Sequence, residues 1–449
     1  MKLKFGLYGC TFLLYALSFA QSESKWQSLF NGQDLKGWRQ VNGKAPYVAK
    51  NNEIVGTSVL QSPNSFLATE KEYGDFILEL ELLVDTLMNS GIQIRSKSAA
   101  EFQNGRVHGY QVEVDPSKRS WTGGIYEEAL RGWLYPPELN PAAPKAFKTL
   151  QWNKIRVECI GNVIRTWVNG TAVACLIDAE TAKGFIALQV HSTDDPLRAG
   201  KDIRWRNIRI QTENLKASPY DDIFIVNTIP NNLSPAEAKN GYSLLWDGES
   251  ATGWRGVRQN KFPENAWEIS HGELTAVKPS GAGSPEGDIV TQKKFKFFEL
   301  KFDFKLTKGA QSGIEYLATE SGRNKEPKGL EYQIIDNSDP EAKMGTGNRT
   351  QASLYDLLPA KKNEKAGRKT GEWNQGIIRV YPNNKAEHWL NGFKLAEYTR
   401  GSAEYLAWVD ASQYKSLKNF GMAKEGRILL QGNGGHVSFR SIKIREVSF

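Results

Sequence analysis

The chain repeats one series of short motifs, in the same order, in its two halves. The motifs of the first half are Leu29-Phe30-Asn31-Gly32 with Gly37-Trp38, Ser90-Gly91-Ile92, Trp152-Asn153, Val168-Asn169-Gly170 and Ile186-Ala187-Leu188-Gln189. Their counterparts are Leu245-Trp246-Asp247-Gly248 with Gly253-Trp254, Ser312-Gly313-Ile314, Trp373-Asn374, Leu390-Asn391-Gly392 and Ile428-Leu429-Leu430-Gln431. A repeat of about 200 residues is far longer than the roughly 20–50 residues of solenoid repeats. The sequence therefore predicts a duplicated domain, with longer loops in the second copy.

Charge and length narrow the functional classes. The 449 residues carry a formal net charge of +8, which is spread along the chain without a long block of Lys or Arg. This pattern favours solubility and attraction to acidic surfaces over binding to nucleic acid. Two domains of this size each bury a substantial core.

The N-terminus has the features of a signal peptide over residues 1–20. Lys2 and Lys4 precede an apolar stretch, and Ser18-Phe19-Ala20 is a small-x-small cleavage signal. We expect export to the periplasm or the medium, with the mature chain starting at Gln21. Cys10 weakly suggests a lipoprotein signal, but most of the apolar stretch follows it, which favours export without lipidation. No later stretch approaches the roughly 20 apolar residues of a membrane span.

Two cysteines follow the signal peptide, Cys159 and Cys175. If 155–160, 163–168 and 172–177 are consecutive hairpin strands, these cysteines lie two strand spacings apart, roughly 9–10 Å. A disulfide needs Cα atoms within about 7 Å. We expect free, buried thiols.

Both halves contain short runs of alternating apolar and polar residues, bounded by Gly, Asn, Asp and Pro. Such runs, as at 76–82 and 298–304, are typical of β-strands. Asn169-Gly170 and Asn391-Gly392 are hairpin-turn signals. Without long helical periodicity, the pattern predicts an all-β fold that closes into jelly-roll-like sandwiches.

The domain boundaries follow from the same signals. We expect a first sandwich over 26–212, a linker over 213–240 and a second sandwich over 241–449. Within the linker, Ser234-Pro235-Ala236-Glu237 carries an N-cap, a proline at the first helical position and a capping-box Glu, and so predicts one short helix.

Alternation also sorts side chains by face within three strands of the first copy, at 91–95, 110–115 and 188–191. Each strand has one apolar row and one polar row. The polar rows contain Gln93 and Arg95; Gln111, Glu113 and Asp115; and Gln189 and His191. They could simply be the solvent face of a sheet. However, an ordinary solvated face is dominated by Lys, Glu, Ser and Thr, whereas these rows combine three Gln, one Arg, one His and carboxylates. With 13 Trp and 16 Tyr in the chain, the rows suit a sugar site, although Trp38, Trp152 and Trp167 are expected in the core.

These motifs, taken together, resemble those of one protein family. They are the Gly-Trp and Trp-Asn motifs above, Ser90-Gly91-Ile92-Gln93-Ile94-Arg95, Gly109-Tyr110-Gln111-Val112-Glu113-Val114-Asp115, Thr122-Gly123-Gly124-Ile125-Tyr126, Leu188-Gln189-Val190-His191 and Arg206-Asn207-Ile208. In this order they resemble the 3-keto-disaccharide hydrolase domain family, and the second copy does too, through Gly329-Leu330-Glu331-Tyr332-Gln333. The resemblance implies two tandem concanavalin-A-like jelly-roll sandwiches, export to the periplasm, and a carbohydrate substrate: a glycoside oxidised to a ketone at sugar C3.

Each copy departs from the family pattern. The first has Gln111 and Glu113 where the family usually has Glu and then Gln. The second has Leu317 in place of Arg95 and Asn433 in place of His191. Its polar face is kept by Glu315, Glu331, Gln333 and Gln431. The departures leave open whether one or both copies are catalytic.

The implied chemistry assigns candidate roles. A C3 ketone acidifies the C2 proton, so cleavage needs a base, a partner for the enolate charge and an acid for the leaving oxygen. The candidates are Glu113 or His191 as base, Arg95 as enolate partner and Tyr126 as acid. The predicted substrate-binding residues are Gln93, Gln111, Gln189, Glu315, Glu331, Gln333 and Gln431. Alternatively, Glu113, His191 and Gln111 could hold a divalent metal ion that chelates the substrate.

Two other functions fit the same fold. One is a pair of carbohydrate-binding modules without activity. The other is an ordinary glycosidase, for which Glu113 and Asp115 have suitable spacing along one strand. Of the remaining histidines, His108 is expected near the rim of the site, whereas no chemical neighbours are predicted for His271, His388 and His436.

Overall fold

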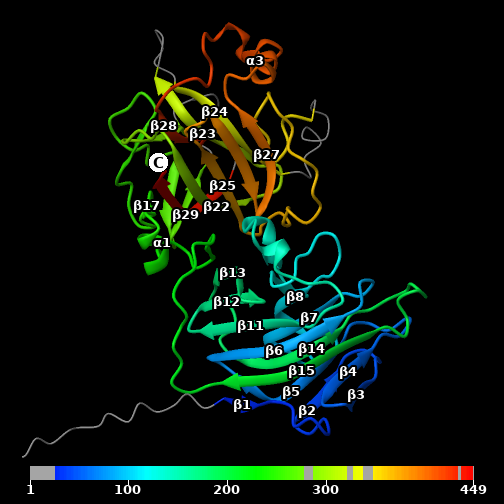
Figure 1. Cartoon of the computed structure of the whole chain (residues 1–449). Coiled ribbons are helices and arrows are strands. Elements are labelled where there is room, and N and C mark those ends of the chain that lie inside the picture. Colours follow the sequence, from blue (N-terminus) through cyan, green and yellow to red (C-terminus); the bar gives the residue numbers. More distant parts are fainter. Residues whose placement is uncertain (1–25, 278–286, 321–326, 337–346, 433–435, 448–449) are drawn as a thin grey trace, which may run out of the picture.

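The computed structural model describes residues 26–277, 287–320, 327–336, 347–432 and 436–447. They form two successive β-sandwiches, which Figure 1 shows stacked one above the other. We call them the first unit and the second unit. The prediction of two tandem all-β jelly-roll sandwiches is confirmed. The predicted signal peptide lies outside the described residues.

The first unit has a nine-stranded sheet and a seven-stranded sheet. In sheet order, the nine-stranded sheet contains β16 (Val226–Asn227), β13 (Thr171–Ile177), β12 (Val163–Val168), β11 (Asn153–Ile160), β6 (Phe76–Val84), β15 (Asp202–Gln211), β4 (Glu53–Thr57) and β3 (Tyr47–Lys50), with β1 (Gln27–Ser28) paired to β15. The seven-stranded sheet contains β10 (Gly132–Tyr135), β9 (Ile125–Glu128), β8 (His108–Val114), β7 (Ser90–Lys97), β14 (Gly184–Val190), β5 (Ser65–Tyr73) and β2 (Trp38–Val41).

The second unit repeats this plan with eight-stranded and five-stranded sheets. The larger contains β19 (Trp267–Ser270), β20 (Glu273–Ala276), β29 (Val437–Glu446), β22 (Phe298–Leu306), β25 (Asn374–Val380), β26 (Lys385–Leu390) and β27 (Phe393–Thr399), with β17 (Ser243–Leu244) paired to β29. The smaller contains β18 (Trp254–Gly256), β21 (Ile289–Thr291), β28 (Arg427–Leu430), β23 (Gln311–Glu320) and β24 (Pro327–Ile335). The short helices are α1 (Pro235–Lys239), α3 (Ala403–Asp410), η1 (Pro137–Leu139), η2 (Ala143–Lys145) and η4 (Gln413–Ser416).

Alternation builds the core of the first unit. Leu78, Leu80 and Leu82 of β6 point from one sheet onto Ile92 and Ile94 of β7 in the other, and all five are buried. Burying a side chain of this size contributes about 1.5–3 kcal/mol. The apolar rows therefore hold the sheets together and leave the polar row of β7 on the opposite face.

Several local predictions are confirmed. Asn169-Gly170 and Asn391-Gly392 both have the left-handed backbone of a two-residue hairpin turn. Cys159 and Cys175 are free and buried. Trp38 and Trp167 are buried as predicted, but the prediction for Trp152 is wrong. Its ring is half-buried and lies under the Arg206 guanidinium, 4.0 Å from the ring centre.

The predicted linker is packed against both units. Ser234 and Glu237 form the expected capping box of α1. The Glu237 carboxylate accepts a 3.0 Å hydrogen bond from Lys443 Nζ in the second unit. Lys301 Nζ donates to the Ile225 carbonyl at 2.8 Å, and β16 extends the nine-stranded sheet beside β13. These contacts tie the linker to both sandwiches.

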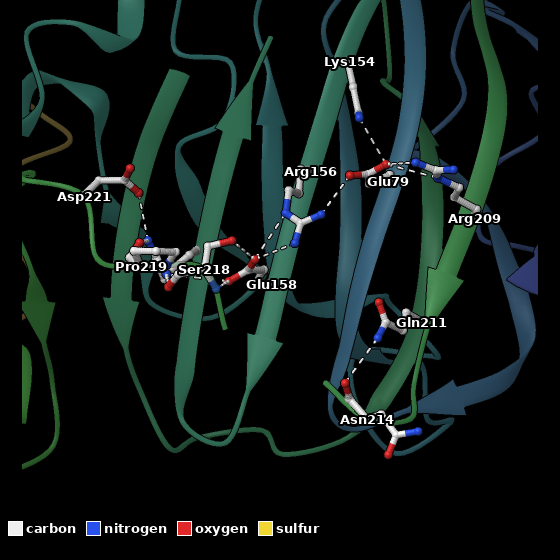
Figure 2. A network of polar contacts seen from close by, with 11 residues as sticks. Glu79, Lys154, Arg156, Glu158, Arg209, Gln211, Asn214, Ser218, Pro219 and Asp221 are labelled. Atoms are coloured by element: carbon white, nitrogen blue, oxygen red, sulfur yellow. Dashed lines mark hydrogen bonds and ion pairs between the residues drawn. The ribbon is translucent and has the colours of Figure 1, made fainter. Parts of the chain in front are cut away.

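A ladder of ion pairs covers the outer face of the nine-stranded sheet (Figure 2). Glu79 accepts hydrogen bonds from Arg156 at 2.8 Å and Arg209 at 2.5 Å. These bonds outweigh burial and lower the pKa of Glu79 to about 2. Glu158 continues the ladder to Ser218 of the linker, through the Ser218 N–H at 3.1 Å. The carboxylates on this face are therefore paired with neighbouring groups of the same face.

The two units also contact each other directly. The Trp121 ring lies 5.7 Å from that of Phe393, and the turn at Gly392 packs against Pro136, just before η1. Arg368 of the second unit donates hydrogen bonds to the carbonyl oxygens of Arg131 and Trp133. None of the helices in the described part of the chain could span a membrane.

Candidate active site

A cavity of about 560 Å³ lies on the polar side of the seven-stranded sheet of the first unit. Its lining includes Gln111, Glu113, Gln189, His191 and Tyr126 from the first unit, and Lys365 and Arg368 from the second. We call it the first-unit cavity. The second unit forms part of its wall, so the polar row is not an open solvent face.

Strand order explains why these side chains meet. β7 lies between β8 and β14, and Gln93 is directly opposite Gln111 in the register of β7 and β8. Gln93, Gln111 and Gln189 are each at most 3% exposed. Polar groups buried to this extent need internal partners.

The three amides form a hydrogen-bonded chain that ends on Glu113. Gln111 Oε1 accepts from Gln93 Nε2 at 2.7 Å and from Gln189 Nε2 at 2.9 Å. Gln111 Nε2 then donates to Glu113 Oε2 at 3.0 Å. Asn89 Nδ2 donates to Glu113 Oε1 at 2.7 Å. The carboxylate is thus held in one orientation by two amides.

Burial dominates the electrostatics of Glu113. It raises the pKa of this carboxyl above the usual value, and the hydrogen bonds from Asn89 and Gln111 offset part of the shift. The Arg119 guanidinium lies 3.8 Å away, but its Nε is engaged by Asp115 Oδ2 at 2.7 Å. Glu113 is therefore more basic than an exposed glutamate.

The Ser-Gly-Ile motif has a packing role at this point. A Cβ on Gly91 would lie 2.3 Å from Gln111 Cδ, so only glycine leaves room for the Gln111 side chain over β7. At the equivalent position of the second unit, a Cβ on Gly313 would lie 2.4 Å from Glu331 Oε1. The repeated glycine thus makes space for a polar side chain from the neighbouring strand.

His191 follows β14 and lines the cavity. Its Nδ1 lies 2.7 Å from the Ser192 carbonyl oxygen. A carbonyl can only accept, so Nδ1 carries the proton and the Nε2 lone pair of the neutral ring remains available. Tyr126 lies beside Gln111 on β9, and burial and the charges of Glu128 and Glu113 raise its pKa. Its hydroxyl therefore stays protonated.

Arg95 does not share the cavity, and its predicted position is wrong. The register of β7 and β8 shifts between Ile94 and Lys97, and Arg95 has a φ of 48°. This bulge breaks the alternation and turns the side chain away from the polar row. The guanidinium donates instead to the carbonyls of Gly74 and Gly161, both at 2.8 Å, and pairs with Asp75 at 2.9 Å.

The hydrogen bonding does not fit a metal chelated by Glu113, His191 and Gln111. Gln111 Oε1 already accepts two amide hydrogen bonds, and its NH₂ group faces Glu113. No group of three or more His, Cys, Asp and Glu side chains suited to a metal occurs among the described residues.

Several residues of the first-unit cavity were not predicted from the sequence. Asn89 directly precedes the Ser-Gly-Ile motif, and its place beside Glu113 could have been suspected from that position. Arg119 lies in the turn after β8. Lys365 and Arg368 come from the other unit, and no sequence pattern reports such packing.

The second unit has its own pocket of about 380 Å³ at the corresponding strands. We call it the second-unit pocket. Glu315 of β23 and Glu331 of β24 face each other in register, and Gln333 and Gln431 complete the predicted set. Burial raises the pKa of Glu315 to about 7, and burial together with the Glu315 charge raises the pKa of Glu331 well above its usual value. Asn433 lies outside the described residues.

The other histidines lie away from the first-unit cavity lining. The His108 ring packs on Phe102, with centroids 4.0 Å apart. His388 does have chemical neighbours, contrary to expectation: its Nε2 lies 2.8 Å from the Tyr316 hydroxyl in the core of the second unit. Burial lowers the pKa of His388 to about 4, so the ring stays neutral.

Known proteins match the chain as follows. The profile of a family described as the 3-keto-alpha-glucoside-1,2-lyase-like domain matches twice, over residues 25–211 and 241–445. A 3-keto-disaccharide hydrolase of Bacteroides thetaiotaomicron is 32% identical over 262 residues, covering 52% of this chain and 84% of the relative.

Two solved structures from Parabacteroides distasonis, both candidate glycosyl hydrolases, are also similar. The first has 27% identity and a TM-score of 0.44, covering 49% of this chain and 100% of its own. The second has 25% identity and a TM-score of 0.33, covering 43% and 99%. Because the family profile spans both sandwiches, the chain is a carbohydrate-active protein that belongs to the 3-keto-alpha-glucoside-1,2-lyase-like domain family, with two copies of that domain.

Proposed function

We propose that the first-unit cavity cleaves 3-keto-glycosides by removal of the C2 proton, elimination of the C1 oxygen and subsequent addition of water. The observation that carries this proposal is Glu113, a buried carboxylate of raised pKa that is oriented by two amides and lines a cavity. Family membership and the name of the Bacteroides relative support the substrate class.

Glu113 is the base in this mechanism. A raised pKa makes a carboxylate better matched to proton abstraction near neutral pH. The C2–H electron pair forms the C2–C3 double bond of an enolate, and the C3 carbonyl takes the negative charge. The enolate then reforms the ketone while C1 and C2 become doubly bonded, and the C1–O bond breaks. Water adds to C1 of the resulting unsaturated ketone.

The remaining cavity groups suit the other steps. The Arg119 guanidinium lies 3.8 Å from Glu113 and favours the ionised form of this base. Tyr126 can donate its hydroxyl proton to the departing oxygen, and His191 can donate from Nε2 when its ring is doubly protonated. Gln189 Oε1 has no hydrogen-bond partner among the described residues. A sugar hydroxyl would supply that missing donor.

The ordinary glycosidase reading has less support. It would use Glu113 and Asp115 as a pair, but Asp115 Oδ2 binds Arg119 and its Oδ1 accepts the Ser117 N–H at 3.0 Å. Asp115 is thus occupied in shaping the turn that positions Arg119. A binding-only role does not call for a buried carboxylate of raised pKa.

The test separates proton abstraction from cleavage. We expect Glu113→Gln to lower both cleavage of a 3-keto-disaccharide and exchange of its C2 proton with D₂O by about 1,000-fold. His191→Gln should lower cleavage by about 100-fold and spare exchange. Products would be followed by mass spectrometry and exchange by NMR. Unchanged rates in both variants, with unchanged melting temperatures, would remove this cavity from the chemistry.

We also propose that residues 1–20 direct export, because Lys2, Lys4 and the small-x-small site have the arrangement of a signal peptide. The mass of the protein recovered from the periplasm should correspond to a start at Gln21. A full-length cytoplasmic product would contradict export.

A further inference from the structure

We infer that the second unit completes the first-unit cavity, and that Lys365 binds the C3 oxygen of the substrate as it becomes negatively charged. This inference rests on the proposed function. It assigns to a residue of the second unit the role of enolate partner, which the chemistry implied by the family resemblance had given to Arg95. The chain would then be one active site built from two units, rather than two independent enzymes.

The segment that directly follows Lys365 is fixed by two contacts. Arg368, three residues after Lys365, donates to the carbonyls of Arg131 and Trp133 in the first unit. Asn391 Nδ2 donates at 2.6 Å to the carbonyl of the adjacent Ala366, which is buried. Lys365 precedes these anchors and lines the cavity. Its backbone position is therefore set by contacts that span the two units.

Among the cations that line the cavity in the described part of the chain, Lys365 is the one still available for a ligand. Two arginines of the lining are neutralised by carboxylates: Arg106 pairs with Glu128 at 3.1 Å and Arg119 with Asp115 at 2.7 Å. Arg131 is likewise engaged, by Asp178 at 2.8 Å among others.

The two cations from the second unit differ in this respect. Neither Lys365 nor Arg368 has an acidic partner within 4.0 Å among the described residues, but Arg368 is engaged by two carbonyls. The Lys365 ammonium lies 5.6 Å from the Trp121 ring centre. Partial burial and the neighbouring Arg119 lower the pKa of Lys365, while Glu113 and Asp115 oppose this. The ammonium thus senses the charges at the Glu113 end of the cavity.

An unpaired ammonium at this place suits the enolate. Negative charge develops on the C3 oxygen only as Glu113 removes the C2 proton, so a cation there stabilises the transition state more than the bound ketone. The lysine forms no covalent bond in this role. Its loss should therefore lower kcat and leave KM nearly unchanged.

The experiment compares three variants of the full chain on a 3-keto-disaccharide. Lys365→Gln removes the charge, Lys365→Arg keeps it, and Lys362→Gln removes a matched exposed lysine outside the cavity lining. We expect Lys365→Gln to lower kcat and C2 proton exchange by about 100-fold, with KM within threefold. Lys365→Arg should recover to within about tenfold of the wild type. Lys362→Gln should have the same kcat and exchange rate as the wild type.

The outcomes separate this inference from the proposed function. If the wild type cleaves the substrate and Lys365→Gln exchanges the C2 proton at the wild-type rate, the inference is wrong and the proposed function stands. A loss in Lys365→Gln that is accompanied by a lower melting temperature and is not rescued by arginine would also overturn it, because it would indicate a packing role. If the wild type neither exchanges nor cleaves, the proposed function itself fails, and the inference with it.

Discussion

The first-unit cavity and the second-unit pocket are built on corresponding strands, yet they differ in charge. Gln111 and Glu113 of β8 correspond to Glu331 and Gln333 of β24, so the carboxylate changes places along the strand. In the second unit Glu315 also faces Glu331, where the first unit has an amide. Duplication has kept the backbone and the glycine that makes room for these groups. The exchanged side chains then give one site a single base and the other a pair of acids.

The coverings of the two sites differ as well. The first-unit cavity takes part of its wall from the other unit, through Lys365 and Arg368. The second-unit pocket is lined by its own residues, including Gln413 and Tyr414 of η4. This asymmetry supports our proposal that the chemistry takes place in the first copy. The second would supply both a wall and a pocket of its own.

The largest expected contrast is between the two glutamates that face these sites. Glu113→Gln should lower kcat by about 1,000-fold, whereas Glu331→Gln should leave it within threefold, because only the first carboxylate lines the cavity that we propose is catalytic. Both substitutions preserve side-chain volume. Steady-state cleavage of a 3-keto-disaccharide measures the difference. The reverse ranking would move the chemistry to the second unit.

The paired acids of the second-unit pocket make its stability depend on pH. The folded-state pKa of Glu315 is about 7, against an ordinary value of 4.5. The fold therefore favours the protonated carboxyl, and stability is lost as pH rises from about 4.5 through about 7. Glu315→Gln removes this loss and keeps an oxygen that can accept the Gly329 N–H.

Glu315→Gln should therefore stabilise the protein at pH 8 by at most about 3 kcal/mol and have little effect at pH 4. Urea unfolding at the two pH values would measure this. The exposed Glu249→Gln serves as the control, and it should show no such pH dependence. Equal effects of Glu315→Gln at both pH values would contradict the raised pKa.

Much of this organisation could be predicted from the sequence, because it depends on local patterns. The repeated motifs predicted two similar sandwiches, and alternation placed Gln93, Gln111 and Gln189 in one polar row. The contacts among these three side chains could not be predicted from the sequence. The strand register is needed to see that Gln111 hydrogen-bonds to both other amides. Nor could the sequence predict that the second unit covers this polar row.

The repeated glycines give a smaller contrast. Gly91→Ala should displace Gln111 and weaken its hold on Glu113, which we expect to lower kcat by about 30-fold because misplacing a catalytic group by about 1 Å is costly. Gly313→Ala displaces Glu331 instead and should leave kcat within threefold. Steady-state kinetics and thermal melting of both variants would test this. Equal losses of activity would show that both polar clusters serve the reaction.

Arg95 shows where alternation fails, and it offers the smallest contrast. Positive φ at this bulge recurs at Leu317, with 48° and 52°, so the backbone irregularity is common to both units while the side chain is not. Three hydrogen bonds hold the Arg95 guanidinium between Gly74, Asp75 and Gly161, away from the first-unit cavity. Arg95→Leu, which copies the second unit, should destabilise the protein by about 1–2 kcal/mol and leave kcat within threefold. Thermal melting and steady-state kinetics would measure the two effects. A variant that melts normally but has lost its activity would return Arg95 to the reaction and remove the need for Lys365.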